Sequence, residues 1–351
     1  MNLKLFMNFS NSLLQWYLQN KRDLPWRNTV NPYQIWLSEI MLQQTRVAQG
    51  MPYFIKFTEV FPTVFDLAKA DEEEVLKLWQ GLGYYSRARN MHKTAQMIAF
   101  ELKGNFPNNY NDLLKLKGVG EYTAAAIASF AFKQAVPVVD GNVFRVLSRY
   151  FDIQTDISLS GAKKEFTAIA TELMPIDKPD LFNQAIMEFG ALQCVPKNPN
   201  CAVCIFNSSC AALQKNKVDQ LPIKTKKTKI TNRFFNYLVV LDSEDKIIIN
   251  KRTEKGIWHN LYEFPVIETE KETNFETIST LVHNRFNELD ITDITIYNEE
   301  QIIHKLSHQH LHINFYKITI SAIINGGIAL ERLRTFPFPI VIFNFIEKYS
   351  I

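Results

Sequence analysis

Residues 116–142 read LKGVGEYTAAAIASFAFKQAVPVVDGN, and two features of this stretch decide the predicted fold of the first half of the chain. The first is the Gly-x-Gly turn at 118–120, which opens onto an alanine-rich segment expected to be helical from Tyr122 to Phe132. Two glycines let the backbone turn tightly and leave the N–H groups at the helix start free to bind an anion. Taken alone, such a turn is more often a structural connection between helices.

The second feature is an acidic residue, Asp140, which follows the apolar pair Val138-Val139 and precedes another predicted helix. Aspartate is common as the N-cap of a helix, and this structural role is compatible with a catalytic one. Together, the turn and the acid favour a helix-hairpin-helix DNA anchor followed by a catalytic carboxylate.

Another acidic residue interrupts an apolar helical face upstream. Glu39 lies in WLSEIMLQQT at 36–45, one turn after Ile35 and three residues before Leu42. Most helical glutamates are simply solvated. On an apolar face, however, desolvation raises the pKa of a carboxyl group and keeps it protonated, as a general acid requires. Glu39 is therefore a candidate proton donor.

The four cysteines of the chain fall in one short stretch, at Cys194, Cys201, Cys204 and Cys210. A disulfide framework would scatter its cysteines through the fold, so metal ligation is the better interpretation. Zinc sites more usually show two C-x2-C pairs separated by about 15 to 20 residues, and only one C-x2-C is present. The spacing predicts one 4Fe-4S cluster held by four thiolates, with chance clustering of buried thiols as the alternative.

Composition and charge describe an ordinary globular protein with room for about two domains. Of the 351 residues, 46% are hydrophobic and 21% are charged, and the net charge is +3. The basic excess lies in one stripe, the stretch 215–233, which contains one acidic residue, Asp219. Its basic residues are Lys215, Lys217, Lys224, Lys226, Lys227, Lys229 and Arg233. No apolar run approaches the ~18 residues that a bilayer span needs, and the start lacks a secretory leader. We therefore expect a cytoplasmic protein without a membrane partner.

The hydrophobic pattern changes at this basic stripe. Before it, apolar residues follow helical spacing in one segment after another, including a helix expected over 35–49. After residue 233, short β-rich runs such as 310–320 take over, with one helix expected over 275–289. We predict an all-α domain at 1–214, a basic linker at 215–232 and an α+β domain at 233–351.

Several motifs together resemble the adenine DNA glycosylase (MutY) family of the endonuclease III, helix-hairpin-helix superfamily. They are LPWR at 24–27, WLSEIMLQQT at 36–45, GLGYYSRARN at 81–90, the 118–124 hairpin, DGN at 140–142 and the cysteine loop. Trp258, EFP at 263–265 and LSH at 306–308 resemble that family's Nudix-like domain, with Leu306 in place of the usual Phe. The resemblance implies a six-helix barrel over about 31–136, an iron–sulfur subdomain formed by 1–30 and 137–214, and an 8-oxoguanine recognition domain at 233–351.

The resemblance also implies an activity, a partner and a set of site residues. A monomeric, nucleoid-associated bacterial enzyme would hydrolyse the N-glycosidic bond of adenine mispaired with 8-oxoguanine or guanine in double-stranded DNA. The implied catalytic residues are Glu39, Asp140, Tyr122 and Asn142, and the implied adenine pocket comprises Trp26, Arg27 and Gln184. The implied DNA contacts are Gln43, Gln44, Thr45, Leu82, Tyr84, Gly118, Val119, Gly120, Ser307 and His308.

Three other functions are weighed against this one. The endonuclease III branch excises oxidised pyrimidines with a nucleophilic Lys where this chain has Tyr122, and tyrosine cannot form a Schiff base. A non-catalytic DNA-binding module would need neither Glu39 nor Asp140. A nucleotide pyrophosphatase would need the metal-binding G-x5-E-x7-R-E-x2-E-E-x-G stretch, which is absent after Gly256.

Overall fold

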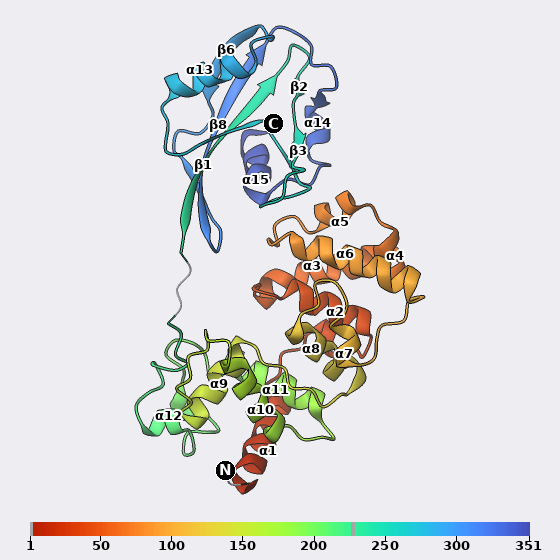
Figure 1. Ribbon diagram of the computed structural model, residues 1–351, viewed down its shortest axis with the longest axis vertical. Coiled ribbons are helices and arrows are strands. Elements are labelled where there is room, and N and C mark those ends of the chain that lie inside the picture. Colours follow the sequence, from red (N-terminus) through yellow and green to blue (C-terminus); the bar gives the residue numbers. More distant parts are fainter. Residues whose placement is uncertain (1–2, 226–228) are drawn as a thin grey trace. The chain divides into compact units, whose positions relative to one another are not determined.

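The structure is a computed structural model that describes residues 3–225 and 229–351 (Figure 1). Lys226 and Lys227 of the predicted linker lie outside the described residues. The chain divides into two compact units, one formed by Met1–Lys69 with Asn90–Lys226 and the other by Ala70–Arg89 with Lys227–Ile351. Segment 70–89, which the sequence places in the helical barrel, is therefore grouped with the C-terminal half.

The first unit is helical, as predicted. Its elements are α1 (Leu3–Asn20), η1 (Pro25–Arg27), α2 (Pro32–Met41), α3 (Val47–Val60), α4 (Val64–Lys69), α6 (Ser86–Gln96, which begins in the second unit), the π-helix η2 (Met97–Glu101), α7 (Tyr110–Leu113), α8 (Glu121–Phe132), α9 (Gly141–Phe151), α10 (Ala162–Leu173), α11 (Pro179–Leu192), η3 (Cys201–Val203) and α12 (Ala211–Gln214). Within the described residues, no helix is long and apolar enough to span a membrane.

The single helix predicted over 35–49 is wrong. Helix α2 ends at Met41 and α3 begins at Val47, because Gln44 adopts a left-handed backbone with φ of 55°. Packing explains the break: a Cβ at Gly50 of α3 would lie 2.9 Å from the Leu42 side chain, so the two helices approach closely. Apolar spacing continues through the turn, so periodicity alone does not reveal it.

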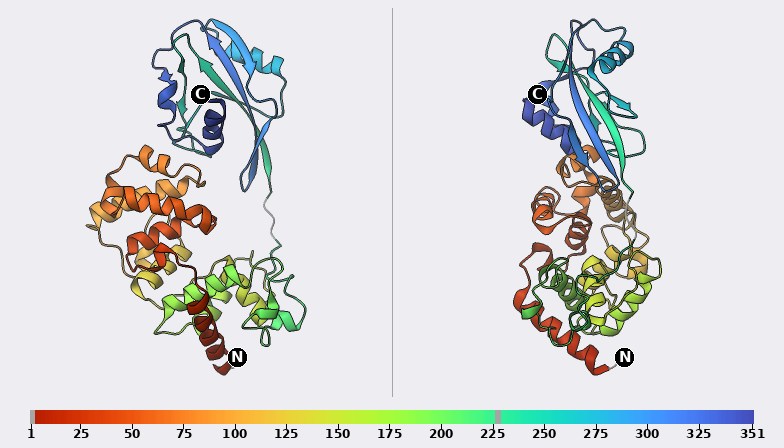
Figure 2. Two further views of the ribbon diagram at one scale, coloured as in Figure 1. Left: turned by 180° about the vertical axis from the view of Figure 1, so that it is seen from behind. Right: turned by 90° about the vertical axis from the view of Figure 1, so that its left-hand side faces the viewer.

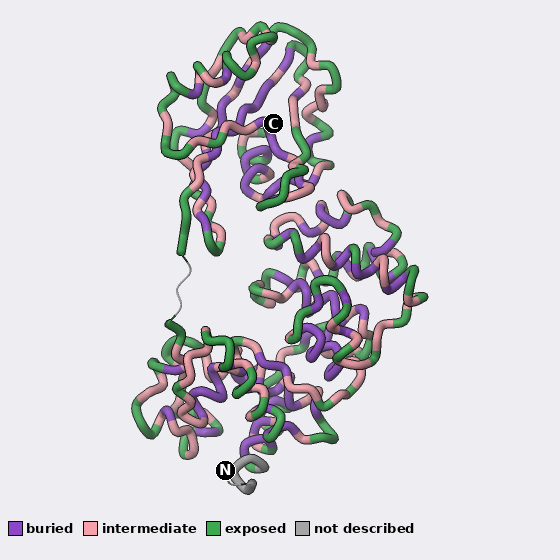
Figure 3. Tube along the Cα trace, in the orientation of Figure 1, coloured by how far each residue is buried: buried purple, intermediate pink, exposed green. Residues whose placement is uncertain are grey.

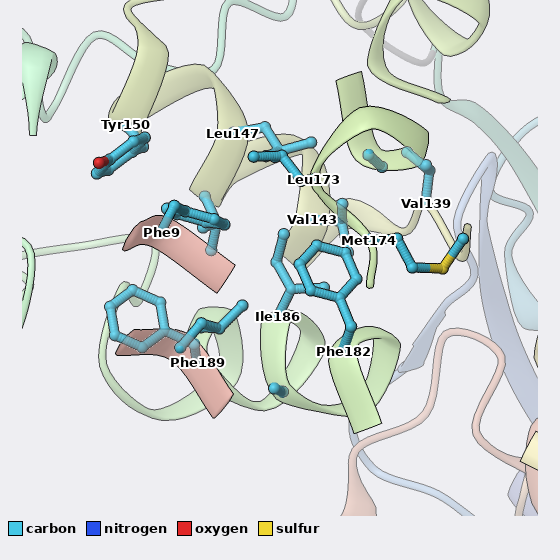
Figure 4. Close-up of a cluster of buried hydrophobic side chains, with 14 of the residues drawn as sticks. Phe9, Val139, Val143, Leu147, Tyr150, Leu173, Met174, Phe182, Ile186 and Phe189 are labelled. Atoms are coloured by element: carbon cyan, nitrogen blue, oxygen red, sulfur yellow. The ribbon is translucent and has the colours of Figure 1, made fainter. Parts of the chain in front are cut away.

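One apolar core of the first unit joins the start of the chain to its middle. Helices α1, α9, α10 and α11 pack their apolar faces together around Phe9, Val143, Phe182 and Phe189 (Figure 4). Cys194, Cys204 and Cys210 pack against the edge of this core. Helix α11, which ends at Leu192 shortly before Cys194, is thus held in place by residues of α1 that are distant in sequence.

The first part of the predicted linker lies on the surface of the first unit. The backbone N–H of Ile157 donates to the carbonyl of Ile223 at 2.9 Å, and Lys215 and Lys217 both pair with Asp152. Part of the basic stripe is therefore neutralised by the chain itself.

The second unit is α+β, as predicted. Its elements are α5 (Glu72–Leu78), β1 (Thr231–Leu241), β2 (Lys246–Ile247), β3 (Asn250–Lys251), β4 (Tyr262–Glu263), β5 (Val266–Thr269), α13 (Phe275–Arg285), β6 (Ile291–Ile296), β7 (Ile302–Lys305), β8 (Gln309–Ile320), β9 (Ile328–Ala329), α14 (Leu330–Leu333) and α15 (Ile340–Tyr349). The main sheet has the order β6-β8-β1-β2-β9, with β5 paired to β1 and β7 to β8, and β3 and β4 form a separate hairpin.

Two long strands form the centre of this sheet. Strands β1 and β8 run parallel, with Tyr237 opposite Phe315, and both are buried along most of their length (Figure 3). Helices α13 and α15 cover opposite faces of the sheet (Figure 2). On the α15 face, the rings of Phe315 and Phe345 stack with centroids 3.7 Å apart.

Candidate active site

The predicted hairpin connects α7 to α8. Gly118 has φ of +75°, a left-handed conformation that favours glycine, and a Cβ there would lie 2.8 Å from Cβ of Asn90. Gly120 is the N-cap of α8, while Val119 is buried and donates its N–H to the carbonyl of Leu116. The amides of the first turn of α8 have no helical partners, so this end of the helix can accept a phosphate.

Asp140 caps α9, as the structural alternative proposed. Its Oδ1 accepts from the backbone N–H of Val143 at 2.8 Å, and its Oδ2 accepts from Nδ2 of Asn142 at 2.8 Å. Burial raises the pKa of Asp140, while these two bonds and the nearby charge of Arg145 oppose the rise. The carboxylate is therefore held in one orientation by bonds that favour its ionised form.

Glu39 lies on α2 and is only 6% exposed. Its pKa is raised to about 7, and burial is the largest cause. The charge of Asp140 raises the pKa further, whereas a hydrogen bond from the Tyr122 hydroxyl and the charge of Arg27 lower it. Burial, with the charges of Glu39 and Asp140, raises the pKa of Tyr122 well above its usual value. The phenol thus stays protonated and donates a hydrogen bond to the Glu39 carboxylate.

These residues share one cavity of about 640 Å³, a volume typical of small-molecule sites. All four predicted catalytic residues and all three predicted pocket residues line it, namely Glu39, Tyr122, Asp140, Asn142, Trp26, Arg27 and Gln184. Thr45, predicted as a DNA contact, also lines it. The structure brings together residues that come from five separate segments of the chain.

The sequence analysis missed a second buried glutamate that lines this cavity. Glu188 is 1% exposed and accepts from the side chains of Arg22 and Arg27 at 2.5 to 2.9 Å. Burial alone would raise its pKa, but the bonds from both arginines lower it to about 2. Glu188 lies four residues after Gln184 on an apolar helix, so the reasoning that identified Glu39 could also have found it.

Two further residues missed in the sequence hold the pocket side chains in place. The hydroxyl of Tyr17, from α1, donates to Oε1 of Gln184 at 2.5 Å. Arg145 donates to Oδ1 of Asn142 at 2.8 Å and to the carbonyl of Cys194 at 2.7 Å. The contacts of Tyr17 with Gln184 and of Arg145 with Cys194 join segments distant in sequence, so no local motif marks them. The contact of Arg145 with Asn142 lies within one turn of α9.

The residues predicted to contact DNA differ in their exposure. Gln43 donates to the Thr123 hydroxyl at 3.1 Å, and Gln44 is exposed at the turn after α2. In the second unit, Tyr84 is 45% exposed, whereas Leu82 is only 4% exposed.

Ser307 and His308 also belong to the second unit. Both are exposed at the tip of the β7–β8 hairpin, where Leu306 N–H donates to the Gln309 carbonyl at 2.8 Å. This turn has the form of a two-residue hairpin connection.

The four cysteines line a second, small cavity with Arg149, Phe189 and Phe206. The backbone N–H of Phe206 donates to Sγ of Cys204 at 3.4 Å, and Arg149 Nη1 lies 3.4 Å from Sγ of Cys194. Such donors stabilise thiolate ligands. Among the described residues, no three His, Cys, Asp or Glu side chains are arranged around a single metal ion. The four cysteines share an apolar cavity that also holds N–H donors to Sγ of Cys194 and Cys204, and this arrangement suits the thiolate ligands of a metal cluster better than those of a single ion.

Comparison with known proteins agrees with this geometry. Residues 37–172 match the family described as "HhH-GPD superfamily base excision DNA repair protein", and residues 236–348 match the NUDIX domain. The fold and site thus define a DNA glycosylase of base excision repair with a C-terminal Nudix-like domain. "Adenine DNA glycosylase" of Buchnera aphidicola subsp. Schizaphis graminum is 38% identical over 306 residues, covering 87% of this chain and 86% of the relative. The chain belongs to the adenine DNA glycosylase family.

Some other relatives match a smaller share of the chain. "Adenine DNA glycosylase" of Homo sapiens is 46% identical over 222 residues, which cover 61% of this chain and 41% of the human protein. A solved "thermostable thymine-DNA glycosylase" is 31% identical with a TM-score of 0.56, covering 60% of this chain and 98% of its own. A non-covalent endonuclease III–DNA complex, at 22% identity and a TM-score of 0.53, covers 62% of this chain and 98% of its own and shows the same fold.

Proposed function

We propose that this enzyme removes adenine mispaired with 8-oxoguanine, or with guanine, from double-stranded DNA by hydrolysing the N-glycosidic bond. The observation that carries the proposal is Glu39, a buried carboxyl group with a pKa of about 7, beside Asp140 in one cavity. A pKa near 7 suits a group that must be protonated before the reaction and ionised after it. We further propose that it acts as a monomer on nucleoid DNA.

The first chemical step is proton transfer to the base. Adenine is a poor leaving group as an anion, so the carboxylic acid of Glu39 donates its proton to N7 of the flipped adenine. The bond from C1′ to N9 then breaks and its electron pair passes to the base. The Tyr122 hydroxyl keeps its bond to Glu39 and stabilises the carboxylate that forms.

The second step uses Asp140. As the deoxyribose becomes an oxocarbenium-like cation, the Asp140 carboxylate stabilises the positive charge at C1′. The Asn142 amide fixes the orientation of that carboxylate, and it can also position the deoxyribose or the attacking water. Water adds to C1′ and its proton passes to the Glu39 carboxylate, which restores the acid, and the enzyme releases adenine and an abasic site.

Tyr122 makes the reaction purely hydrolytic, because it cannot form the Schiff base of a bifunctional glycosylase. Borohydride added during turnover should trap little covalent enzyme–DNA adduct. Efficient trapping would mean that a lysine acts as nucleophile and would favour the endonuclease III type of reaction.

The substrate is tested by comparing duplexes that differ in one pair. Purified protein is incubated with adenine opposite 8-oxoguanine, adenine opposite guanine, thymine opposite guanine, and thymine glycol. We expect adenine release to be fastest opposite 8-oxoguanine, with neither thymine substrate cleaved. Release of thymine glycol without adenine would replace the proposal by an activity on oxidised pyrimidines.

DNA binding on the glycosylase side is assigned to backbone and loop contacts. The turn at 118–120 and the start of α8 bind a phosphate. Gln43 and Tyr84 wedge into the base stack, and Gln44, Thr45 and Leu82 contact the lesion. Lysine and arginine residues of the basic linker add phosphate contacts, so affinity falls as salt rises.

We also propose that Cys194, Cys201, Cys204 and Cys210 hold one 4Fe-4S cluster. Cys194, Cys204 and Cys210 pack against the apolar core of the first unit, so a cluster held by these thiolates would join the cysteine loop to that core. The purified protein should show visible charge-transfer absorption and contain about four irons per chain, and Cys201→Ser should lose both along with part of the DNA affinity. One zinc ion in place of iron would contradict this assignment.

A further inference from the structure

The loop between α5 and α6 holds an exposed aromatic residue on an unusual backbone. Tyr84 is 45% exposed and has φ of 48°, and it follows Gly83 with φ of 78°. A non-glycine residue in the left-handed region is uncommon and costs free energy, so the surrounding structure must impose it. An exposed ring held in this way on a DNA glycosylase is suited to stacking against bases.

Side chains at both ends of the loop fix its shape. Arg87 donates to the carbonyls of Leu82 at 3.2 Å and Gly83 at 2.9 Å, and its guanidinium lies 5.5 Å from the ring centre of Tyr84. Nε1 of Trp79, at the end of α5, also donates to the Gly83 carbonyl, at 3.0 Å. The position of Tyr84 therefore depends on where α5 ends and where α6 begins.

Residues of the Nudix-like domain hold the start of α5. Glu73 accepts from Nζ of Lys251 at 2.7 Å and from the Tyr262 hydroxyl at 2.8 Å, both on the β3–β4 hairpin. The adjacent Glu72 accepts from the side-chain amide of Asn260. The bonds from Lys251 and Tyr262 lower the pKa of Glu73, although burial opposes them. Both Glu72 and Glu73, in the first turn of α5, are therefore hydrogen-bonded to residues of the Nudix-like domain.

The same domain also contacts the other end of the loop. Arg89, in α6, donates to the carbonyl of His259 at 2.7 Å, and the Tyr85 hydroxyl lies 3.5 Å from the carbonyl of Phe338. Lys77 of α5 donates to the Phe336 carbonyl at 3.2 Å. The segment that carries Tyr84 is therefore held before the loop, within it and after it.

We propose that the β3–β4 hairpin positions Tyr84, so that the contact of Glu73 with Lys251 and Tyr262 is a specificity-determining contact for the glycosylase reaction. This inference rests on the proposed function, because it requires Tyr84 to meet the mispaired DNA. It assigns the Nudix-like domain a role besides its own DNA contacts at the β7–β8 hairpin. Glu73 positions Tyr84 through α5 and touches neither substrate nor catalytic residues.

The test is a charge exchange across this contact. Glu73→Lys and Lys251→Glu each place like charges side by side, and each should lower the ratio of adenine excision opposite 8-oxoguanine to that opposite guanine by about twofold to fivefold. The double variant restores one ion pair and should recover most of the ratio. Glu244→Lys, which breaks the exposed pair with Lys246 in the same unit, is the matched control and should change nothing.

A second cycle separates positioning from stability. Glu73→Lys combined with Tyr84→Ala should lower the ratio no further than Tyr84→Ala alone, because Glu73 acts only through that ring. Additive effects, or a fall in Tm with an unchanged ratio, would overturn the inference and leave the contact structural. Absence of adenine excision by the wild-type protein would refute the proposed function itself. An active wild-type enzyme whose excision ratio is unchanged in the Glu73 and Lys251 variants would refute only this inference.

Discussion

Glu39 and Glu188 line the same cavity, and both are almost completely buried, yet their pKa values move in opposite directions. The pKa of Glu39 is about 7, whereas that of Glu188 is about 2. At neutral pH the cavity therefore holds one carboxyl group with an available proton, Glu39, and one that is ionised, Glu188.

The partners explain the difference. Glu188 accepts hydrogen bonds from Arg22 and Arg27, so its charge is neutralised on both oxygens. Glu39 has the neutral hydroxyl of Tyr122 as its bonded partner and the negative charge of Asp140 nearby. Burial raises the pKa in both cases, and the presence or absence of bonded arginines decides the outcome. Arg27 acts on both glutamates, but it is hydrogen-bonded only to Glu188, and Glu39 therefore keeps a proton that it can donate.

The largest expected effect follows from removing the proton of Glu39. Glu39→Gln keeps the shape of the side chain but has no acidic proton, so single-turnover adenine release should fall about 10³-fold. Binding to the mispaired duplex, measured by titration, should be retained. A variant within tenfold of wild type would remove Glu39 from the role of general acid.

Asp140→Asn should have the second largest effect. The amide has no negative charge for the developing cation, and the rate should fall about 10²-fold. Asparagine caps helices as well as aspartate does, so Tm should stay close to that of wild type. A large fall in Tm together with the rate would mean that the cap, and not the charge, explains the loss.

Glu188→Gln tests the other side of the comparison. The substitution leaves two arginines without their carboxylate, so we expect the free energy of unfolding to fall by about 2 kcal/mol. The loss is smaller than for a fully buried ion pair because Arg22 is partly exposed to solvent. The folded-state pKa of Glu188 is depressed, so this stability is present above the unfolded pKa near 4.5 and is lost as pH falls toward 2. Denaturant unfolding of both proteins at pH 7 and pH 3 measures the difference, which should shrink at the lower pH.

A smaller effect is expected for a change in the second unit. The double variant Ser307→Ala, His308→Ala removes hydrogen-bonding groups at the tip of the β7–β8 hairpin, which we propose contact the Hoogsteen edge of 8-oxoguanine. The preference for 8-oxoguanine over guanine should narrow by about tenfold or less, since one base contact is worth about 1 kcal/mol. Excision from a saturating guanine mispair should not change. An unchanged preference would assign lesion recognition to Gln44, Thr45 and Leu82.

Sequence motifs predicted the parts of the site that local rules determine. The Gly-x-Gly turn, the Asp140 cap and the apolar face around Glu39 each follow from neighbours within one helical turn. The bonds between Glu188 and Arg22 and between Tyr17 and Gln184 join segments that only the fold brings together. The same limit applies to α2 and α3, whose break at Gln44 depends on the contact between Gly50 and Leu42.

The most direct test of the central claim is the pH dependence of single-turnover adenine release from a duplex with adenine opposite 8-oxoguanine. If Glu39 donates the proton, the rate constant should be level below pH 7 and fall about tenfold per pH unit above it, because the donor is then ionised. The residual activity of Glu39→Gln should lack this decline. A wild-type rate that stays constant to pH 9, or a variant that keeps the same decline, would contradict the account.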